Sequence, residues 1–166
     1  MGTKIYPTGD SYSFQFNMAK DVSWIHADIG PEMLRETHKH WAGVIYLTPN
    51  APVQAGTTLY CYKHLTNDSN EIISVLDIFK QKNTTYEAEV FFQNISNCGS
   101  DRSKWESQTT FGNIYNRCII YPAEYFHESS TYFGNNVHDC RLIQVIFFYT
   151  KINDTSTDII EYKVTE

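Results

Sequence analysis

The chain has 166 residues and a formal net charge of −6, which suits one domain with a buried core better than two. We therefore predict a single domain over residues 1–166. The 13 Lys and Arg residues form no run, so a nucleic-acid partner is not expected. No apolar stretch approaches the roughly 20 residues of a membrane-spanning helix, and the first residues lack the order of a signal peptide. A cytoplasmic protein without membrane contact is the resulting expectation.

The first motif along the chain is a His-x-Asp pair, His26 and Asp28, in the stretch SWIHADIG at residues 23–30. If this stretch is a strand, the period of two places both side chains on one face, where they are able to bind a metal. An isolated His-x-Asp is more often surface decoration. Two ligands also hold a catalytic metal weakly, so the metal interpretation needs a third ligand from elsewhere in the chain.

The next stretches favour a loop and then two strands. His38 and His40 in ETHKHW also lie two apart and offer an alternative to His26, but their charged surroundings predict a solvated loop. WAGVIYLTP at 41–49 and TTLYCYKH at 57–64 are rich in β-branched and aromatic residues. They predict strands, joined by a turn at 50–56 that contains Asn, Pro and Gly.

Residues 65–112 interrupt this β pattern and are predicted to be an insertion. Within it, NEIISVLDIFKQK at 70–82 carries apolar residues at helical spacing, which predicts a helix. NCGSDRSKWESQTT at 97–110 is expected to be a loop. Two roles remain open for the insertion: a lid over a substrate, or a structural support.

The last third predicts two further strands, NRCIIYP at 116–122 and RLIQVIFFYTKI at 141–152. The second is almost entirely apolar, so burial on both faces is expected. The loop between them contributes a further histidine, His127, and Arg141 opens the final strand. An arginine at the start of so apolar a strand needs a partner. Strands near both ends of the chain predict a mainly β fold, either a sandwich or a jelly roll.

These parts, taken in order, resemble the iron(II)- and 2-oxoglutarate-dependent oxygenases, particularly the prolyl-hydroxylase-like branch. The resemblance rests on HAD at 26–28, GVIYL at 43–47, AGTTLY at 55–60, FHES at 126–129 and RLIQVIFF at 141–148. It spans roughly Trp24 to Tyr149. It implies a double-stranded β-helix (jelly roll) with the helix and loop insertion at about 65–112 between its two halves.

The resemblance also implies roles for individual residues. In this family two histidines and one carboxylate hold iron and leave positions open for a 2-oxo acid and for oxygen. His26, Asp28 and His127 match these catalytic metal ligands. Arg141 and Tyr46 match the positions that bind the distal carboxylate of 2-oxoglutarate, because a guanidinium is a suitable partner for a buried anion.

The implied cofactors are iron(II), 2-oxoglutarate as cosubstrate, O2, and ascorbate as a reductant. The implied reaction hydroxylates a C–H bond and releases succinate and CO2. The carboxylate of Asp28 favours hydroxylation over halogenation, because related halogenases carry a small residue there. Trp41 and Tyr60 are the candidate substrate contacts, although aromatic residues in a β-protein more often belong to the core or its rim.

Two alternatives stay open at this point. One is a cupin-like metal-binding protein of other chemistry, which binds iron but ignores 2-oxoglutarate. The other is a non-catalytic jelly-roll binding module in which His26 and His127 never meet. The substrate of an oxygenase is expected to be a peptide or protein side chain or a small molecule, and the loops that would select it are variable.

Overall fold

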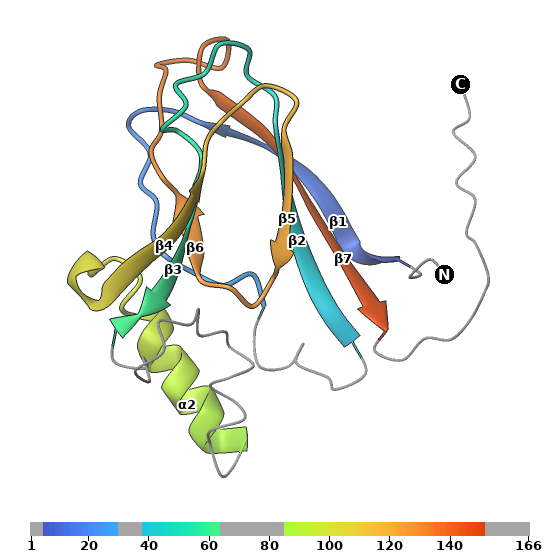
Figure 1. The fold of residues 1–166 in the computed structure, drawn as a ribbon, viewed down its shortest axis with the longest axis vertical. Helices are drawn as coiled ribbons and strands as arrows, with labels where there is room; N and C mark the ends of the chain where they lie inside the picture. The colour runs from blue at the N-terminus through green and yellow to red at the C-terminus, as the bar shows by residue number, and fades with distance from the viewer. Residues whose placement is uncertain (1–4, 30–37, 64–84, 152–166) are drawn as a thin grey trace.

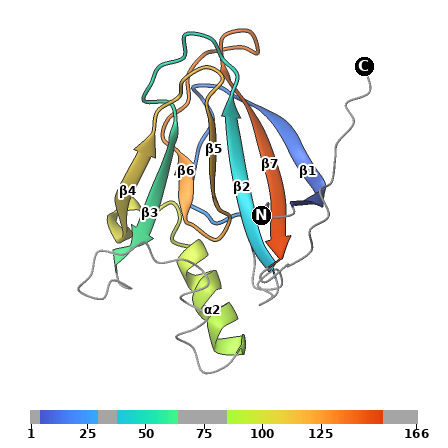
Figure 2. The ribbon, with the colours of Figure 1, turned by 45° about the vertical axis from the view of Figure 1, so that its right-hand side comes forward.

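The computed structural model describes residues 5–29, 38–63 and 85–151. They form a mainly β structure with two antiparallel sheets (Figure 1, Figure 2). One sheet has four strands in the order β1-β7-β2-β5, and the other has three in the order β4-β3-β6. The elements are β1 (Tyr6–Asn17), β2 (His38–Tyr46), β3 (Thr57–Tyr62), α2 (Thr85–Ser96), the short 3-10 helix η3 (Arg102–Lys104), β4 (Trp105–Phe111), β5 (Cys118–Pro122), β6 (His127–Ser129) and β7 (Arg141–Lys151).

The chain passes repeatedly from one sheet to the other. After β2 in the four-stranded sheet, β3 and β4 form a pair in the three-stranded sheet; β5 returns, β6 crosses again and β7 returns. An isolated antiparallel bridge joins His26 to His127 of β6. The segment around His26 therefore runs beside β6, at the edge of the three-stranded sheet opposite β4. Figure 1 shows the two sheets facing each other across the core.

The expected strands at 41–49, 57–64, 116–122 and 141–152 are confirmed by β2, β3, β5 and β7. The expectation that the last strand is buried on both faces is wrong. Ile143 and Val145 are buried, whereas Leu142 and Ile146, which flank them in the sequence, keep partial exposure. The apolar side chains of β7 thus point to both faces of the sheet, and those on the inner face line the core.

Three further stretches differ from expectation. β4 lies where a loop is expected; its residues are mostly polar because it pairs only with β3 at a sheet edge, so no alternation marks it. His38 and His40 lie in β2 rather than in a loop, because β2 continues its pairing with β7 as far as the pair His38 and Lys151. β1 is also unexpected, since Pro7 and Gly9 in its first half are typical of turns. The expected helix at 70–82 lies outside the described residues.

The described part of the insertion packs as a support. Phe92 and Ile95 of α2 form a cluster with Ile25, Trp105 and Phe126. The helix α2 lies at the end of the three-stranded sheet where β3 ends and β4 begins (Figure 1, Figure 2). No helix among the described residues is both long and apolar enough to cross a membrane.

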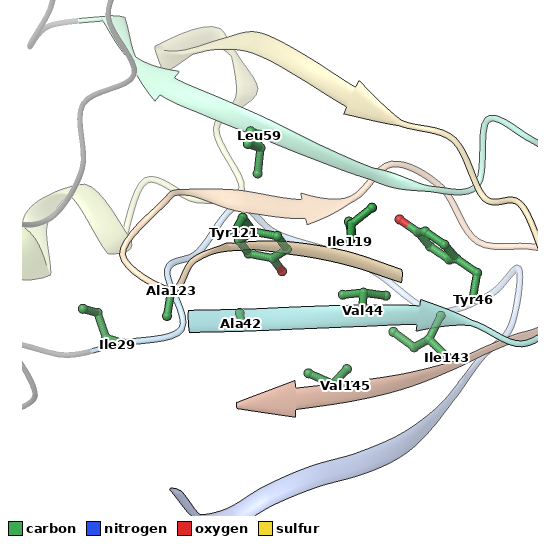
Figure 3. Close-up of a cluster of buried hydrophobic side chains, with 10 residues drawn as sticks. All are labelled: Ile29, Ala42, Val44, Tyr46, Leu59, Ile119, Tyr121, Ala123, Ile143 and Val145. Atoms are coloured by element: carbon green, nitrogen blue, oxygen red, sulfur yellow. The ribbon is translucent and has the colours of Figure 1, made fainter. Parts of the chain in front are cut away.

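The main core fills the space between the two sheets (Figure 3). It draws inward-facing side chains from β2, β3, β5 and β7, together with Ile29 and Ala123. The buried members are Ile29, Ala42, Val44, Tyr46, Leu59, Ile119, Tyr121, Ala123, Ile143 and Val145. Two of them, Tyr46 and Tyr121, carry hydroxyl groups into this otherwise apolar interior, so the core contains polar atoms that need an explanation.

Gly56, just before β3, lies against the end of β4. A Cβ atom at Gly56 would stand 1.8 Å from the carbonyl oxygen of Phe111 and 3.1 Å from the amide nitrogen of Asn113. The carbonyl of Gly56 also accepts hydrogen bonds from the Ser130 amide and from Arg141. Close backbone approach therefore requires glycine at this position.

We expect Gly56→Ala to lower the free energy of unfolding by about 3 kcal/mol, because backbone atoms must move to admit the methyl group. Chemical denaturation measures this change. Gly43→Ala is the comparison, since the atoms nearest its added Cβ belong to the side chain of Ile146 rather than to the backbone. Equal losses in the two variants would contradict the argument from backbone contact.

Candidate metal centre

The structure brings His26, Asp28 and His127 together. One possible ligand atom from each lies within 4.8 Å of the others. Nε2 of His26 is 3.6 Å from Oδ1 of Asp28, and Nε2 of His127 is 3.3 Å from Oδ2 of the same carboxylate. The two imidazoles thus approach different oxygens of one carboxylate, and their ring centroids are 4.5 Å apart.

Backbone pairing holds the three residues in this arrangement. The amide of His26 donates to the carbonyl of His127 at 3.0 Å, and the amide of His127 donates back at 2.8 Å. The amide of Asp28 donates to the carbonyl of Ala123 at 2.9 Å. Because residues 26 and 28 alternate along an extended segment, their side chains share a face, and the bridge brings that face beside His127.

The hydrogen bonds of both rings determine which nitrogen carries the proton. Nδ1 of His26 lies 2.9 Å from the carbonyl oxygen of Trp24, and Nδ1 of His127 lies 2.9 Å from that of Tyr125. A carbonyl oxygen only accepts, so each Nδ1 donates, and in a neutral ring Nε2 carries a lone pair. Both lone pairs then face the Asp28 carboxylate. A cation between the two Nε2 atoms and the carboxylate would relieve the repulsion. A hydrogen bond from Nδ1 to a carbonyl oxygen is also typical of histidines that bind a metal through Nε2.

The two histidines differ in exposure. The His127 side chain is 7% exposed, whereas that of His26 is 41% exposed. Burial lowers the pKa of His127, an effect that the nearby Asp28 carboxylate partly opposes. The neutral, metal-binding form of His127 is therefore favoured. His26 faces solvent beside the exposed ring of Trp24, whose centroid is 6.1 Å away.

Arg141 is 1% exposed at the start of β7. Its Nε donates to the carbonyl of Ala55 at 3.1 Å, Nη2 to the carbonyl of Gly56 at 3.3 Å, and Nη1 to Oδ1 of Asn17 at 3.2 Å. All these acceptors are neutral, and no carboxylate of the described chain contacts the guanidinium. Burial lowers the pKa of Arg141, but a guanidinium stays charged in proteins. The interior therefore contains a cation whose charge the described residues do not balance.

Tyr46 lies beside this cation. The Cζ atom of Arg141 is 5.7 Å from the centroid of the Tyr46 ring. The Tyr46 hydroxyl donates to Oγ1 of Thr57 at 2.8 Å, and burial raises the pKa of the phenol. The two residues expected to bind a carboxylate are thus neighbours inside the core, and the phenol remains a hydrogen-bond donor.

Tyr121 is a member of this interior that sequence reasoning missed. It projects from β5 into the core, is 4% exposed, and its ring centroid is 4.8 Å from that of His127 (Figure 3). Burial raises the pKa of Tyr121 well above its usual value, with the Asp28 carboxylate as the next cause. In the sequence, CIIYP has the composition of an ordinary strand. The one available signal is that Tyr121 lies two residues after Ile119 and therefore points to the same face of the strand.

A buried carboxylate on the outer face of the three-stranded sheet was also missed. Glu128, next to His127 in β6, is 0% exposed. It accepts hydrogen bonds from both Nη atoms of Arg102 and, at 2.6 Å, from the Tyr60 hydroxyl. Burial and this carboxylate raise the pKa of Tyr60 to about 12. The contacts join β6 to β3 and to η3, and thus brace the strand that carries His127.

The expected substrate contacts, Trp41 and Tyr60, do not point toward the three candidate metal ligands (the triad). Ala42 and Leu59 face the core, so the alternation of β2 and β3 turns Trp41 and Tyr60 outward. Trp41 donates from Nε1 to Oγ1 of Thr150 at 3.1 Å on the outer face of the four-stranded sheet. Tyr60 is held by Glu128 on the other side of the molecule. We therefore correct both assignments.

The remaining histidines of the described chain lie outside the cluster. His38 and His40 contact the ring of Tyr149, with centroid distances of 4.7 Å and 5.9 Å. They do not belong to the possible metal-binding group found among the described residues. His138 is exposed in a turn before β7, in agreement with the loop expected there.

Comparisons with known proteins leave the family open. No protein-family model matches the chain, and no curated protein sequence matches it significantly. Among solved structures, the chain is similar to apo HygX from Streptomyces hygroscopicus, with a TM-score of 0.35 and 12% identity. The match covers 84% of this chain and 55% of the HygX chain. A similarity this low carries no argument about fold or function.

We expect Arg102→Ala to lower the free energy of unfolding by about 1–3 kcal/mol, because it leaves the Glu128 carboxylate buried without its cation. The larger loss typical of a fully buried ion pair is not expected, since the Arg102 side chain is 55% exposed. Urea denaturation measures the loss. Glu106→Gln, which changes an exposed residue of β4, should shift stability by less than about 0.5 kcal/mol. Similar effects of the two changes would refute the bracing role.

The lowered pKa of His127 predicts a pH dependence of the metal-free protein. Below its ordinary value of 6.5, the unfolded chain binds a proton that buried His127 resists. The titration of His127 therefore leaves the free energy of unfolding unchanged well above pH 6.5 and lowers it as the pH drops below this value. The difference in unfolding free energy between wild type and His127→Asn should decrease from pH 7.5 to pH 5.5 in chelator. A difference that stays constant over this range would show that burial does not lower this pKa.

Proposed function

We propose that this protein is an iron(II)- and 2-oxoglutarate-dependent oxygenase that hydroxylates a C–H bond of a peptide or protein side chain or of a small molecule. The observation that carries the proposal is the convergence of two imidazole Nε2 atoms on the two oxygens of Asp28. Each ring has its other nitrogen bonded to a backbone carbonyl. The three groups therefore present electron pairs, rather than protons, to one another.

The donor set fits iron(II). Two neutral imidazoles and one carboxylate form the ligand type of non-haem iron oxygenases, which leaves positions for further ligands. Adjacent ligands of a metal with bonds of about 2.1 Å lie roughly 3 Å apart. The distances of 3.3 Å and 3.6 Å to the Asp28 oxygens are close to this value. His26, Asp28 and His127 would hold the metal with small side-chain adjustments.

The buried cation fits a dicarboxylate cosubstrate. Arg141 has neutral acceptors only among the described residues, so an anion would balance its charge. His127 pairs with Leu59 in β3, whereas Tyr46 contacts Thr57, two residues along the same strand. A two-residue step in a strand is about 6.6 Å. A five-carbon 2-oxo dicarboxylate suits a site with the metal ligands at one end and Arg141 with Tyr46 at the other.

The strand arrangement supports a double-stranded β-helix as the finer description of the fold. Chain segments alternate between the sheets, and the segment at His26 runs beside β6 as a fourth extended segment of the smaller sheet. In this topology the metal ligands come from that segment and from β6. The cation comes from the last strand, which lies in the middle of the opposite sheet.

Iron(II) with 2-oxoglutarate and O2 supplies a coupled oxidation, in which the 2-oxo acid becomes succinate and CO2 and a C–H bond of the substrate becomes C–OH. The residues of this chain position the reactants. Arg141 would bind the distal carboxylate, and Tyr46 would join it by turning its hydroxyl proton from Thr57 to the anion, while Val44, Ile143 and Val145 would exclude water from the cosubstrate. The exposed side of His26 indicates where a substrate approaches.

The test is an anaerobic titration with iron(II) and then 2-oxoglutarate, followed by the visible metal-to-ligand charge-transfer band. His127→Ala should abolish the band. Arg141→Ala should raise the 2-oxoglutarate concentration for half-saturation about 10- to 100-fold, since charge-assisted hydrogen bonds are lost. Lys63→Ala is the control: it removes an exposed cation, just after β3, that bonds the Ser103 carbonyl, and the band should persist. Ascorbate belongs in the later aerobic assays as reductant.

Other outcomes select the alternatives. Iron binding without a charge-transfer band would favour a cupin-like metal protein that does not use 2-oxoglutarate. A chain that binds no iron would be better described as a non-catalytic binding module.

A further inference from the structure

The hydroxyl of Tyr121 lacks a hydrogen-bond partner among the described residues, although the side chain is 4% exposed. Its ring packs against the ring of His127 at a centroid distance of 4.8 Å. A hydroxyl in an apolar interior is costly unless protein, water or a ligand satisfies it. A tyrosine at a position where phenylalanine would fill the same space therefore indicates a polar partner beyond the described residues, either water or a ligand.

This oxygen is not fully enclosed. In the described part of the chain, the side-chain oxygen or nitrogen that is both fully enclosed and without a hydrogen bond is Oδ1 of Asn113. The Tyr121 hydroxyl is less enclosed than Oδ1 of Asn113, so water or a ligand atom is able to reach it. The phenol differs in this respect from Tyr46, whose hydroxyl is already bonded to Thr57.

Tyr121 lies at the metal-ligand end of the core, where its ring packs against His127, and it pairs with Ala42 of β2, the strand that ends at Tyr46. The ionisable groups that act on the Tyr121 phenol are Asp28 from the triad, and Tyr46 and Arg141 from the carboxylate-binding end. The other hydroxyl among the buried members of the core cluster belongs to Tyr46 and is bonded to Thr57. An anion that extends from the metal ligands to Arg141 would pass beside the Tyr121 hydroxyl.

We propose that Tyr121 binds the cosubstrate directly, with its hydroxyl donating a hydrogen bond to an oxygen of the 2-oxo acid held between the metal ligands and Arg141. This inference rests on the proposed function. It assigns to β5 a contact with the cosubstrate that neither the triad nor the carboxylate-binding pair supplies. The apolar ring of Tyr121 separately packs against His127, and that packing does not depend on the hydroxyl.

The experiment compares wild type with Tyr121→Phe, which removes the hydroxyl and keeps the ring. Iron(II) affinity is measured anaerobically, and 2-oxoglutarate affinity is measured both by the charge-transfer band and by calorimetry on the zinc-loaded protein. Because a hydrogen bond to a charged group is lost, we expect 2-oxoglutarate to bind about tenfold more weakly. Iron(II) affinity should stay within about twofold. Tyr115→Phe, the same change at an exposed turn residue, should alter neither affinity.

Each result has one meaning. Equal 2-oxoglutarate affinity in wild type and Tyr121→Phe would overturn the inference and leave the proposed function intact. A parallel loss of iron(II) and 2-oxoglutarate affinity would also overturn it, since the hydroxyl would then act through His127. If wild type binds iron(II) but no 2-oxoglutarate, the proposed function itself fails.

Discussion

The buried cation of Arg141 joins the two sheets. Arg141 opens β7 in the four-stranded sheet, yet it donates to the carbonyls of Ala55 and Gly56, which lead into β3 of the other sheet. It also reaches Asn17 at the end of β1. A charged group is costly to enclose in an apolar core, and neutral carbonyls compensate it only in part. The end of the core near Arg141 is therefore organised around a charge that the described residues leave unbalanced.

The pattern of the chain was sufficient to predict the central strands and the residues that meet in the site. β-branched and aromatic runs mark β2, β3, β5 and β7, because these strands bury one face against the core. His26, Asp28 and His127 were recognised from the order of motifs rather than from any one of them. That order is informative because the ligands lie on segments whose pairing brings distant parts of the chain together.

The rest depends on contacts that a sequence does not display. Trp41 and Tyr60 have the composition of substrate contacts, but the register of their strands turns them outward, and one residue of register reverses the face. Glu128 looks like a surface residue until Arg102, from a distant loop, is seen to pair with it. Tyr121 looks like a core residue until its hydroxyl is found without a partner in the part of the chain that the structure describes. Polar groups on apolar strands thus need three-dimensional context before a role can be assigned.

The unequal exposure of the two histidines has a kinetic consequence. His127 is enclosed and braced from behind through Glu128, whereas His26 presents much of its ring to water on an edge segment. Exchange of any bound ion would begin with dissociation of the His26 imidazole, which solvent can replace, while His127 and Asp28 stay in place. An ion bound at such a site would therefore exchange with the metals in the surrounding solution.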